Sequence, residues 1–250
     1  MNDEALVTRN AFLDGRVSAW QSRTGFRAGS DSVILAAACG ARPGDSVLEL
    51  GCGAGVVSLC LAARVPDLHI VAVDSDAEAW GLAQRNFKGQ SQMSAVQADI
   101  ADLPKNVRQM SFAHVIANPP FFAQGSLAPN PARAAARHES RAMAEWIGAA
   151  RRRHSSDGEL TLILKANRLA DALANLNQGF GGIIVKPIAA RQGHEAGRVV
   201  IRARKGARSE LRLLAPIILH EGAEHTQDGA DDLTSEARAI LRDGAALAWS

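Results

Sequence analysis

Apolar residues in this chain gather in short runs that alternate with longer amphipathic stretches. Seven of the short runs have the length and β-branched content of buried strands: 46–50, 69–74, 94–99, 114–117, 159–164, 182–187 and 198–204. Helical spacing of apolar positions falls between them: 31–40, 56–65, 77–87, 141–154 and 168–176. Strands that alternate with helices of this length favour right-handed βαβ units, and therefore an α/β fold with a mostly parallel sheet.

The last two expected strands depart from this alternation. Only about 10 residues (188–197) join them, which is too short for a helical crossover, so the seventh strand is expected to pair antiparallel. Residues 1–30 are polar and are expected to form an N-terminal extension with a short hairpin, and Ser30-Asp31 offers an N-cap for the first helix. No repeat or linker interrupts the chain, so 1–250 is expected to be one domain with its core at 31–250.

A glycine-rich turn follows the first expected strand. Residues 49–55 read Glu-Leu-Gly-Cys-Gly-Ala-Gly, and glycines at a strand-to-helix turn let the backbone approach a ligand closely. The dinucleotide fingerprint G-x-G-x-x-G would need glycine where Val56 stands, which disfavours a pyrophosphate ligand and a nicotinamide dehydrogenase. Asp74 and Asp99 end the next two expected strands at the same sheet edge, where one carboxylate can hold a ribose and the other an adenine amino group. Helix capping is the competing interpretation for both acids.

The segment Asn118-Pro119-Pro120-Phe121 directly follows the fourth expected strand. Two prolines remove two N–H donors, so the segment offers acceptors, namely the Asn118 side-chain oxygen and the Pro119 carbonyl. Two convergent acceptors suit a planar amino group, and Phe121 or Phe122 can stack on the ring that bears it. A structural turn with an Asn cap is the alternative interpretation. Only the position of the segment, at the end of the fourth expected strand, favours a catalytic role.

These motifs resemble those of class I S-adenosylmethionine-dependent methyltransferases, specifically the amino-methyltransferases with an (N/D)PP(F/Y/W) motif. Four further segments resemble the bacterial tRNA(Val) anticodon-loop adenine-N6 methyltransferases: 8–12 (TRNAF), 25–31 (GFRAGSD), 219–222 (LHEG) and 240–247 (ILRDGAAL). The resemblance spans nearly the whole chain. It implies a Rossmann-like, three-layer α/β/α fold whose seven-stranded sheet ends in an antiparallel strand.

The same resemblance assigns roles to individual residues. The implied cofactor is S-adenosylmethionine, held by Glu49, Gly51, Gly53, Gly55, Asp74, Asp99 and Asn118. The implied catalytic residues are Asn118, Pro119, Pro120 and Phe121. Residues 25–31 resemble the part that folds over the methionyl end of the cofactor, although Arg27 and Asp31 could equally form a structural ion pair. The candidate substrate-binding residues are Arg27, Phe122, Arg133, Arg137 and His138.

Composition changes this picture mainly through the distribution of charge. The net charge is only +2, from 28 Lys+Arg against 26 Asp+Glu, which excludes a uniformly basic nucleic-acid binder. Arginines nevertheless cluster at 133–153 and 191–212, whereas residues 221–236 carry six acids and no Lys or Arg. The two basic blocks could follow an RNA backbone, or they could simply solvate helix and strand surfaces. The chain has no Tyr, so base stacking would fall to Phe121 or Phe122.

The leading hypothesis is therefore methylation of an adenine N6 in the anticodon loop of a tRNA. Methylation of a ribosomal RNA base or of a protein glutamine is the enzymatic alternative; the glutamine family normally has an N-terminal helical domain, for which residues 1–30 leave no room. A scaffold that binds cofactor without chemistry is the non-enzymatic alternative, and the intact 118–121 motif argues against it. The acidic start and the apolar runs give no signal peptide or membrane span, so a cytoplasmic location without a membrane or obligate protein partner is expected. Cys39, Cys52 and Cys60 lack metal-ligand spacing, so no metal site is expected.

Overall fold

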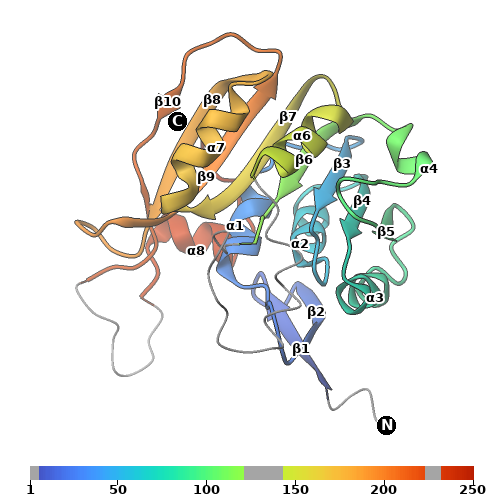
Figure 1. The fold of residues 1–250 in the computed structure, drawn as a ribbon. Helices are drawn as coiled ribbons and strands as arrows, with labels where there is room; N and C mark the ends of the chain where they lie inside the picture. Colours follow the sequence, from blue (N-terminus) through green and yellow to red (C-terminus); the bar gives the residue numbers. More distant parts are fainter. Residues whose placement is uncertain (1–5, 121–142, 223–231) are drawn as a thin grey trace.

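A computed structural model describes residues 6–120, 143–222 and 232–250 of the chain (Figure 1). The main sheet has the strand order β10-β8-β9-β7-β6-β3-β4-β5, with β11 also pairing with β8. Its strands are β3 (Ser46–Leu50), β4 (His69–Asp74), β5 (Met93–Gln97), β6 (Phe112–Ala117), β7 (His154–Lys165), β8 (Phe180–Ala189), β9 (Ala196–Lys205), β10 (Arg212–Leu213) and β11 (Ile217–Ile218). The first seven of these correspond to the seven strands expected from the sequence.

The sheet is parallel from β5 through β7, and β9 alone runs against its neighbours. β9 lies between β7 and β8 and pairs antiparallel with both. The short connection between β8 and β9 therefore forms a turn, as its length predicted. The two-residue strands β10 and β11 add to the far side of β8 and were not expected, because so short a pairing has no apolar alternation to mark it.

Helices cover both faces of the sheet and produce three layers (Figure 1). One buried cluster lies under α1 (Ser30–Ala38), α2 (Val56–Arg64), α3 (Ala77–Asn86) and α8 (Ser235–Leu241). The other lies under α4 (Lys105–Arg108), α6 (Met143–Arg153) and α7 (Leu169–Leu176), which follows the 3-10 turn η3 (Ala166–Arg168). Successive side chains of β3 show why both faces must be covered, because Val47 belongs to the first cluster and Leu48 to the second. The expected three-layer α/β/α architecture is confirmed.

Three local expectations were wrong. β7 begins at His154, directly after α6, because His154 pairs with Phe112 of β6. The register then shifts before regular pairing resumes at Glu159, so no apolar alternation marks the start of this strand. β5 ends at Gln97, so Asp99 lies beyond the strand and does not end it. The N-cap of α1 is Gly29, with no side-chain capping bond, because Ser30 and Asp31 already lie within the helix.

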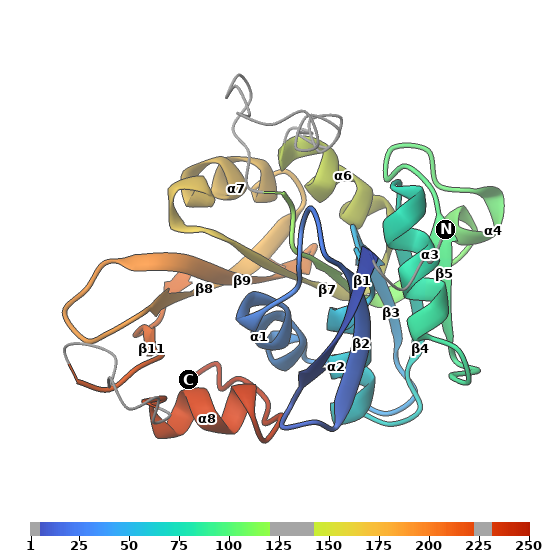
Figure 2. The same cartoon turned by 90° about the horizontal axis from the view of Figure 1, so that it is seen from below.

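The N-terminal extension forms a hairpin of β1 (Val7–Phe12) and β2 (Val17–Ser22), which confirms the expected hairpin. Figure 2 shows the hairpin lying outside the main sheet, where β2 contacts α2 and α3. In the described part of the chain, no helix has the length and apolar content needed to cross a membrane.

Candidate functional site at the carboxyl edge of the sheet

The sequence-predicted residues meet at one edge of the sheet, where the parallel strands β3, β4, β5 and β6 end. The register of these strands places Leu50, Val73 and Ala117 side by side at this edge. Asp74 pairs with Gln97 of β5, and the Ala98 N–H donates to the Asp74 carbonyl at 2.9 Å. The turn after β3, the end of β4, the segment after β5 and Asn118 after β6 therefore surround one crevice position, which is where α/β sheets bind ligands.

The three glycines of the turn after β3 all adopt left-handed backbone conformations, with φ of 67° at Gly51, 54° at Gly53 and 77° at Gly55. A Cβ on Gly51 would lie 2.7 Å from the Trp146 ring, and one on Gly55 would lie 2.6 Å from the Phe87 ring. A Cβ on Gly53 would meet nothing closer than Phe26 at 4.0 Å. Two of the glycines therefore make room for packed aromatic rings, and only Gly53 leaves its backbone open to an approaching ligand.

Asp74 at the end of β4 organises this turn. Its Oδ2 accepts the Gly53 N–H at 2.7 Å, and its Oδ1 accepts the Asp76 N–H at 3.0 Å. Burial raises the pKa of Asp74, while these backbone bonds oppose that rise. Ser75 contributes a further backbone bond, and because a carboxylate has about four lone-pair sites, Asp74 can still accept a hydrogen bond from a ligand hydroxyl.

Glu49 of β3 is buried and bonds to the helix that follows the glycine turn. Its Oε2 accepts both the backbone N–H of Ser58, at 3.1 Å, and the Ser58 hydroxyl. Burial raises the pKa of Glu49 to about 8, against the lowering effect of the Ser58 bonds. Glu49 thus ties β3 to the first turn of α2 and supports the glycine turn from beneath.

Asp99 lies two residues beyond β5 in an Asx-type turn. Its Oδ1 accepts the Ala101 N–H at 2.8 Å, and its carbonyl accepts the Asp102 N–H at 3.0 Å. The turn is anchored next to β4, because the preceding Ala98 bonds to Asp74. The structure therefore brings Asp99 to the same edge as Asp74 by way of a loop.

Asn118 shows the least ordinary polar environment of the site. Both its Oδ1 and its Nδ2 are buried and have no hydrogen-bond partner among the described residues. The following Pro119 is buried and Pro120 is half-buried, so the backbone after Asn118 offers carbonyls without N–H groups. An unpartnered buried amide costs about 1–3 kcal/mol, so Asn118 is a candidate for binding a ligand.

Arg27 and Asp31 do not form the ion pair considered from the sequence. Arg27 donates to the Thr8 hydroxyl, the Asn10 side chain and the Ser22 carbonyl, at 2.9, 2.8 and 2.7 Å, and so closes the open end of the hairpin. Asp31 pairs instead with Arg198 at 2.9 Å, and this ion pair joins α1 to the beginning of strand β9. Both interactions position the 25–31 segment beside the glycine turn, where Phe26 approaches Gly53.

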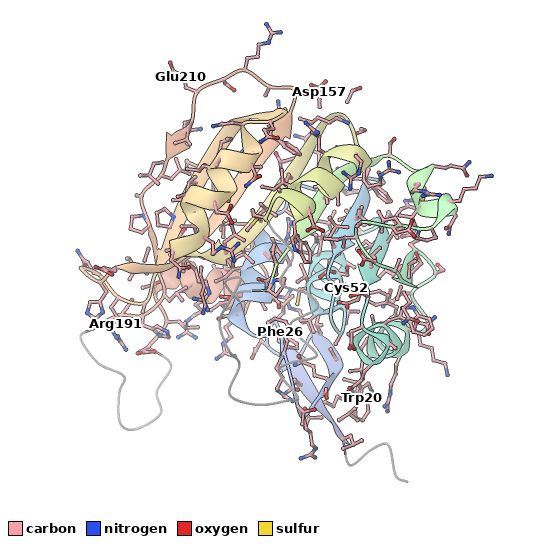
Figure 3. The ribbon with its side chains drawn as sticks, viewed as in Figure 1. Trp20, Phe26, Cys52, Asp157, Arg191 and Glu210 are labelled. Atoms are coloured by element: carbon pink, nitrogen blue, oxygen red, sulfur yellow. The ribbon has the colours of Figure 1, made fainter. Side chains whose placement is uncertain are left out.

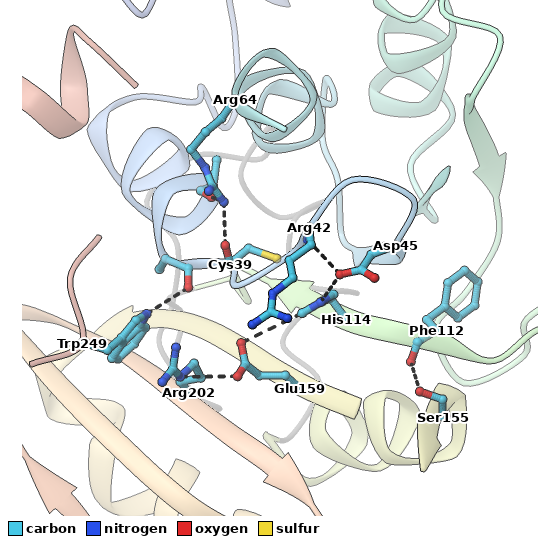
Figure 4. Close-up of polar contacts among 12 residues, drawn as sticks. Cys39, Arg42, Asp45, Arg64, Phe112, His114, Ser155, Glu159, Arg202 and Trp249 are labelled. Carbon is cyan, nitrogen blue, oxygen red and sulfur yellow. Dashed lines mark hydrogen bonds and ion pairs between the residues drawn. The ribbon is translucent and has the colours of Figure 1, made fainter. Parts of the chain in front are cut away.

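The described arginines of the two basic blocks mostly serve the fold. In the second block, Arg191 pairs with Asp232 at 2.7 Å, and Arg202 pairs with Glu159 at 3.4 Å and lies over the Trp249 ring (Figure 4). The partners come from distant parts of the sequence, so the acidic segment 221–236 already neutralises part of the block. In the first block, Arg151, Arg152 and Arg153 end α6 next to the first residue of β7, at the amino edge of the sheet.

Sequence patterns missed the aromatic and amide side chains that hold the glycine turn. Trp146 of α6 and Phe87 after α3 press on Gly51 and Gly55. Asn86 donates from Nδ2 to the carbonyls of Trp20 and Ala54, at 2.9 and 2.8 Å, and its Oδ1 accepts the Trp20 N–H at 2.8 Å. The only sequence signal was that Asn86 ends an amphipathic helix. Phe121, Phe122, Arg133, Arg137 and His138 lie outside the described residues.

Comparisons with known proteins agree with this arrangement. Residues 22–193 match the family model described as methyltransferase small domain. The chain is 32% identical over 164 residues to a tRNA1(Val) (adenine(37)-N6)-methyltransferase of Actinobacillus succinogenes, over 64% of this chain and 69% of the relative. It is 34% identical over 151 residues to a protein of the same name from Shewanella baltica, over 58% of this chain and 63% of that relative. The match thus spans about two thirds of the length of these relatives.

A solved structure supports the fold along most of the chain. The structure is described as a predicted O-methyltransferase from Agrobacterium tumefaciens and aligns with a TM-score of 0.71 and 25% identity. The alignment covers 87% of this chain and 98% of that chain, so the fold is shared over most of this chain.

Proposed function

Because the chain belongs to the methyltransferase small domain family, we propose that it transfers a methyl group from S-adenosylmethionine to the exocyclic N6 of an adenine in a tRNA, in the anticodon loop of a tRNA(Val)-type molecule. The relatives in Actinobacillus succinogenes and Shewanella baltica bear names with this activity. The observation that carries the proposal is the buried, unpartnered amide of Asn118 beside an open glycine backbone. A tRNA substrate places the reaction in the cytoplasm.

The residues at the carboxyl edge fit S-adenosylmethionine, the cofactor of the family. When bound, this cofactor supplies an electrophilic methyl group attached to a sulfonium sulfur. Asp74 retains acceptor capacity for a ribose hydroxyl, Asp99 lies at the same edge for the adenine, and Gly53 admits the ligand next to the backbone. The left-handed turn is made rigid by Glu49 and Ser58, so it is formed before the cofactor arrives.

The motif after β6 then positions the target amine. Asn118 Oδ1 and the Pro119 carbonyl each accept one of the two amine hydrogens, which draws the nitrogen toward a pyramidal geometry and aims its lone pair at the methyl carbon. The amine needs no protein base, because the methylated nitrogen loses its proton to water. Phe121 is proposed to stack on the adenine ring.

The acceptor pair also favours an amine over a hydroxyl as the target. A hydroxyl has one hydrogen and would leave one of the two acceptors without a donor, whereas an exocyclic amine satisfies both. An adenine in an anticodon loop can leave its stack at a lower cost than a paired base, which suits a crevice that encloses the amine.

A substrate panel with labelled cofactor tests the proposal. We expect label transfer to an unmodified tRNA(Val) transcript, and none to a tRNA(Val) transcript with guanosine in place of the anticodon-loop adenines. Transfer confined to ribosomal RNA fragments or to a glutamine-containing protein would overturn the tRNA assignment while keeping the amine chemistry. No transfer to any amine substrate by a chain that binds the cofactor would overturn the proposal as a whole.

A further inference from the structure

A group of exposed arginines lies beside the glycine turn, on the hairpin and on α3, outside both basic blocks. The hairpin region 6–27 contains Arg9, Arg16, Arg23 and Arg27 against the single acid Asp14. Arg9 and Arg23 are exposed on the hairpin, and Arg85 is exposed on the last turn of α3. We call Arg9, Arg23 and Arg85 the hairpin cations.

Aromatic stacking and single hydrogen bonds hold the hairpin cations in place. The guanidinium carbon of Arg85 lies 3.9 Å from the Trp20 ring centroid, and that of Arg9 lies 5.9 Å from the same centroid. Arg9 also donates from Nε to the Ser18 hydroxyl at 2.7 Å, and Arg23 donates from Nε to the Val7 carbonyl at 3.3 Å. Stacking and Nε bonding order these exposed side chains, which lowers the entropy lost on binding an anion.

The hairpin cations differ from the block arginines in their charge balance. Within residues 6–120, 143–222 and 232–250, none of the three forms an ion pair with a carboxylate, whereas Arg191, Arg198 and Arg202 each do. In these described ranges, no carboxylate offsets their positive charge, and exposed positive charge of this kind attracts phosphate.

These cations are also joined rigidly to the proposed active site. The Asn86 Oδ1 accepts the Trp20 N–H, and the Asn86 Nδ2 donates to the Trp20 carbonyl. The same Nδ2 also donates to the carbonyl of Ala54 in the glycine turn. Phe26, in the segment between β2 and α1, is 66% exposed and approaches Gly53, so an exposed apolar ring lies beside the glycine turn. In Figure 3, Trp20 and Phe26 lie on the same side of the molecule as Cys52, whereas Asp157 and Glu210 mark the opposite, amino edge.

We propose that the hairpin cations bind backbone phosphates of the tRNA next to the nucleotide whose base enters the site, and that the β1–β2 hairpin is thus the substrate-docking surface. This inference rests on the proposed function, because an RNA substrate provides the phosphates. Ordered arginines without acidic partners match a phosphate backbone in charge and in donor geometry. Their attachment to the glycine turn through Asn86 places the bound backbone at a fixed position relative to the crevice.

The test is binding of an unmodified tRNA(Val) transcript to Arg9→Gln/Arg85→Gln as a function of KCl concentration. We expect affinity roughly tenfold weaker at moderate salt, and a slope of log Kd against log salt that is lower by about 2. The matched control is Arg152→Gln/Arg208→Gln, which removes the same charge from exposed side chains at the amino edge and should bind tRNA as the wild type does. Arg9→Lys/Arg85→Lys keeps the charge and should restore most of the salt dependence.

The outcomes separate this inference from the function on which it rests. Cofactor affinity measured by calorimetry and the unfolding midpoint should be the same in all variants, which shows that the site and the fold are intact. Equal losses in the hairpin variant and the amino-edge control, or no loss in the hairpin variant, would overturn the docking surface while wild-type tRNA methylation upholds the function. A wild-type chain that binds cofactor but neither binds nor methylates tRNA would overturn the proposed function first, and the docking surface with it.

Discussion

The backbone N–H of Gly53 donates a hydrogen bond to Oδ2 of Asp74 at 2.7 Å. One carboxylate therefore fixes the open glycine of the turn after β3 and, with its remaining lone pairs, faces the position expected for the cofactor ribose. Asp74 also accepts from the Asp76 N–H, so the end of β4, the turn after β3 and the first turn of α3 share a single anchor. Loss of this side chain should disturb the shape of the site and its chemistry together.

Asp74→Ala should weaken cofactor binding by about 100-fold or more, because the substitution removes the charge-assisted bonds to the ribose and the anchor of the turn. Calorimetric titration with S-adenosylmethionine measures the effect. Asp102→Ala is the control, since that carboxylate is exposed and pairs only loosely with Arg108, at 3.6 Å. An unchanged affinity in Asp74→Ala would remove Asp74 from the cofactor site.

The glycines of the turn should separate into two classes on substitution. Gly55→Ala forces a Cβ to within 2.6 Å of the Phe87 ring at a positive φ, so it should lower the free energy of unfolding by about 2–4 kcal/mol. Gly53→Ala meets open space, so it should cost only about 1–2 kcal/mol of backbone strain yet weaken cofactor binding. Denaturant unfolding and calorimetry on the two variants provide the comparison, and a reversed order of destabilisation would contradict the packing described here.

Buried Glu49 should make stability fall as pH rises. Its pKa is about 8 in the folded chain against 4.5 for a free side chain, so the folded state retains a proton that the unfolded state releases between these values. With respect to Glu49, the free energy of unfolding is therefore at its maximum below pH 4.5. It falls as the pH rises toward 8, by at most about 1.4 kcal/mol per pH unit. Glu49→Gln should flatten the dependence of unfolding free energy on pH across this window in the absence of cofactor. Parallel pH profiles for variant and wild type would show that Glu49 is ionised in the folded protein.

Short-range patterns predicted those parts of the fold that apolar runs and glycines mark. Strands β3 and β4 begin and end where the sequence placed them, because each is an almost uninterrupted buried run. The first residues of β7 were missed because only His154 pairs with β6 before the register shifts, so this part of the strand carries no apolar alternation. The carboxyl edge as the expected ligand position followed from topology, and Glu49, Asp74 and Asn118 became candidates through their positions relative to the strands.

Long-range contacts were beyond the reach of these patterns. That Gly51 makes room for a ring depends on Trp146, which is far away in the sequence and reaches the turn only in the folded chain. Counting charge along the chain made the basic block at 191–212 look available for RNA. In the folded chain, however, Arg191 and Arg202 form ion pairs with carboxylates that are distant in the sequence. The hairpin cations were missed because they are separated in the sequence and form no run of charge. Only folding brings Arg9 and Arg85 together on the ring of Trp20.

Asn118→Ala should separate chemistry from binding and from stability. Removing the acceptor should lower the rate of methyl transfer to tRNA by a factor of about 100 or more, because the amine loses its orientation, while cofactor affinity stays near the wild-type value. The substitution also removes an unpartnered buried amide, so the free energy of unfolding should not fall. Single-turnover rates, calorimetry and denaturant unfolding test the three statements. Asn118→Asp keeps an acceptor oxygen and should be more active than Asn118→Ala, and an alanine variant with full activity would contradict the amine clamp.

The central claim is that the methyl group reaches the exocyclic nitrogen of an adenine in tRNA. It is tested most directly by incubating the chain with S-adenosylmethionine and an unmodified tRNA(Val) transcript, digesting the RNA to nucleosides and identifying the methylated product by mass spectrometry. We predict N6-methyladenosine as the methylated nucleoside, and its loss in Asn118→Ala. A product methylated on a ribose oxygen, on a ring nitrogen or on another base would contradict the account.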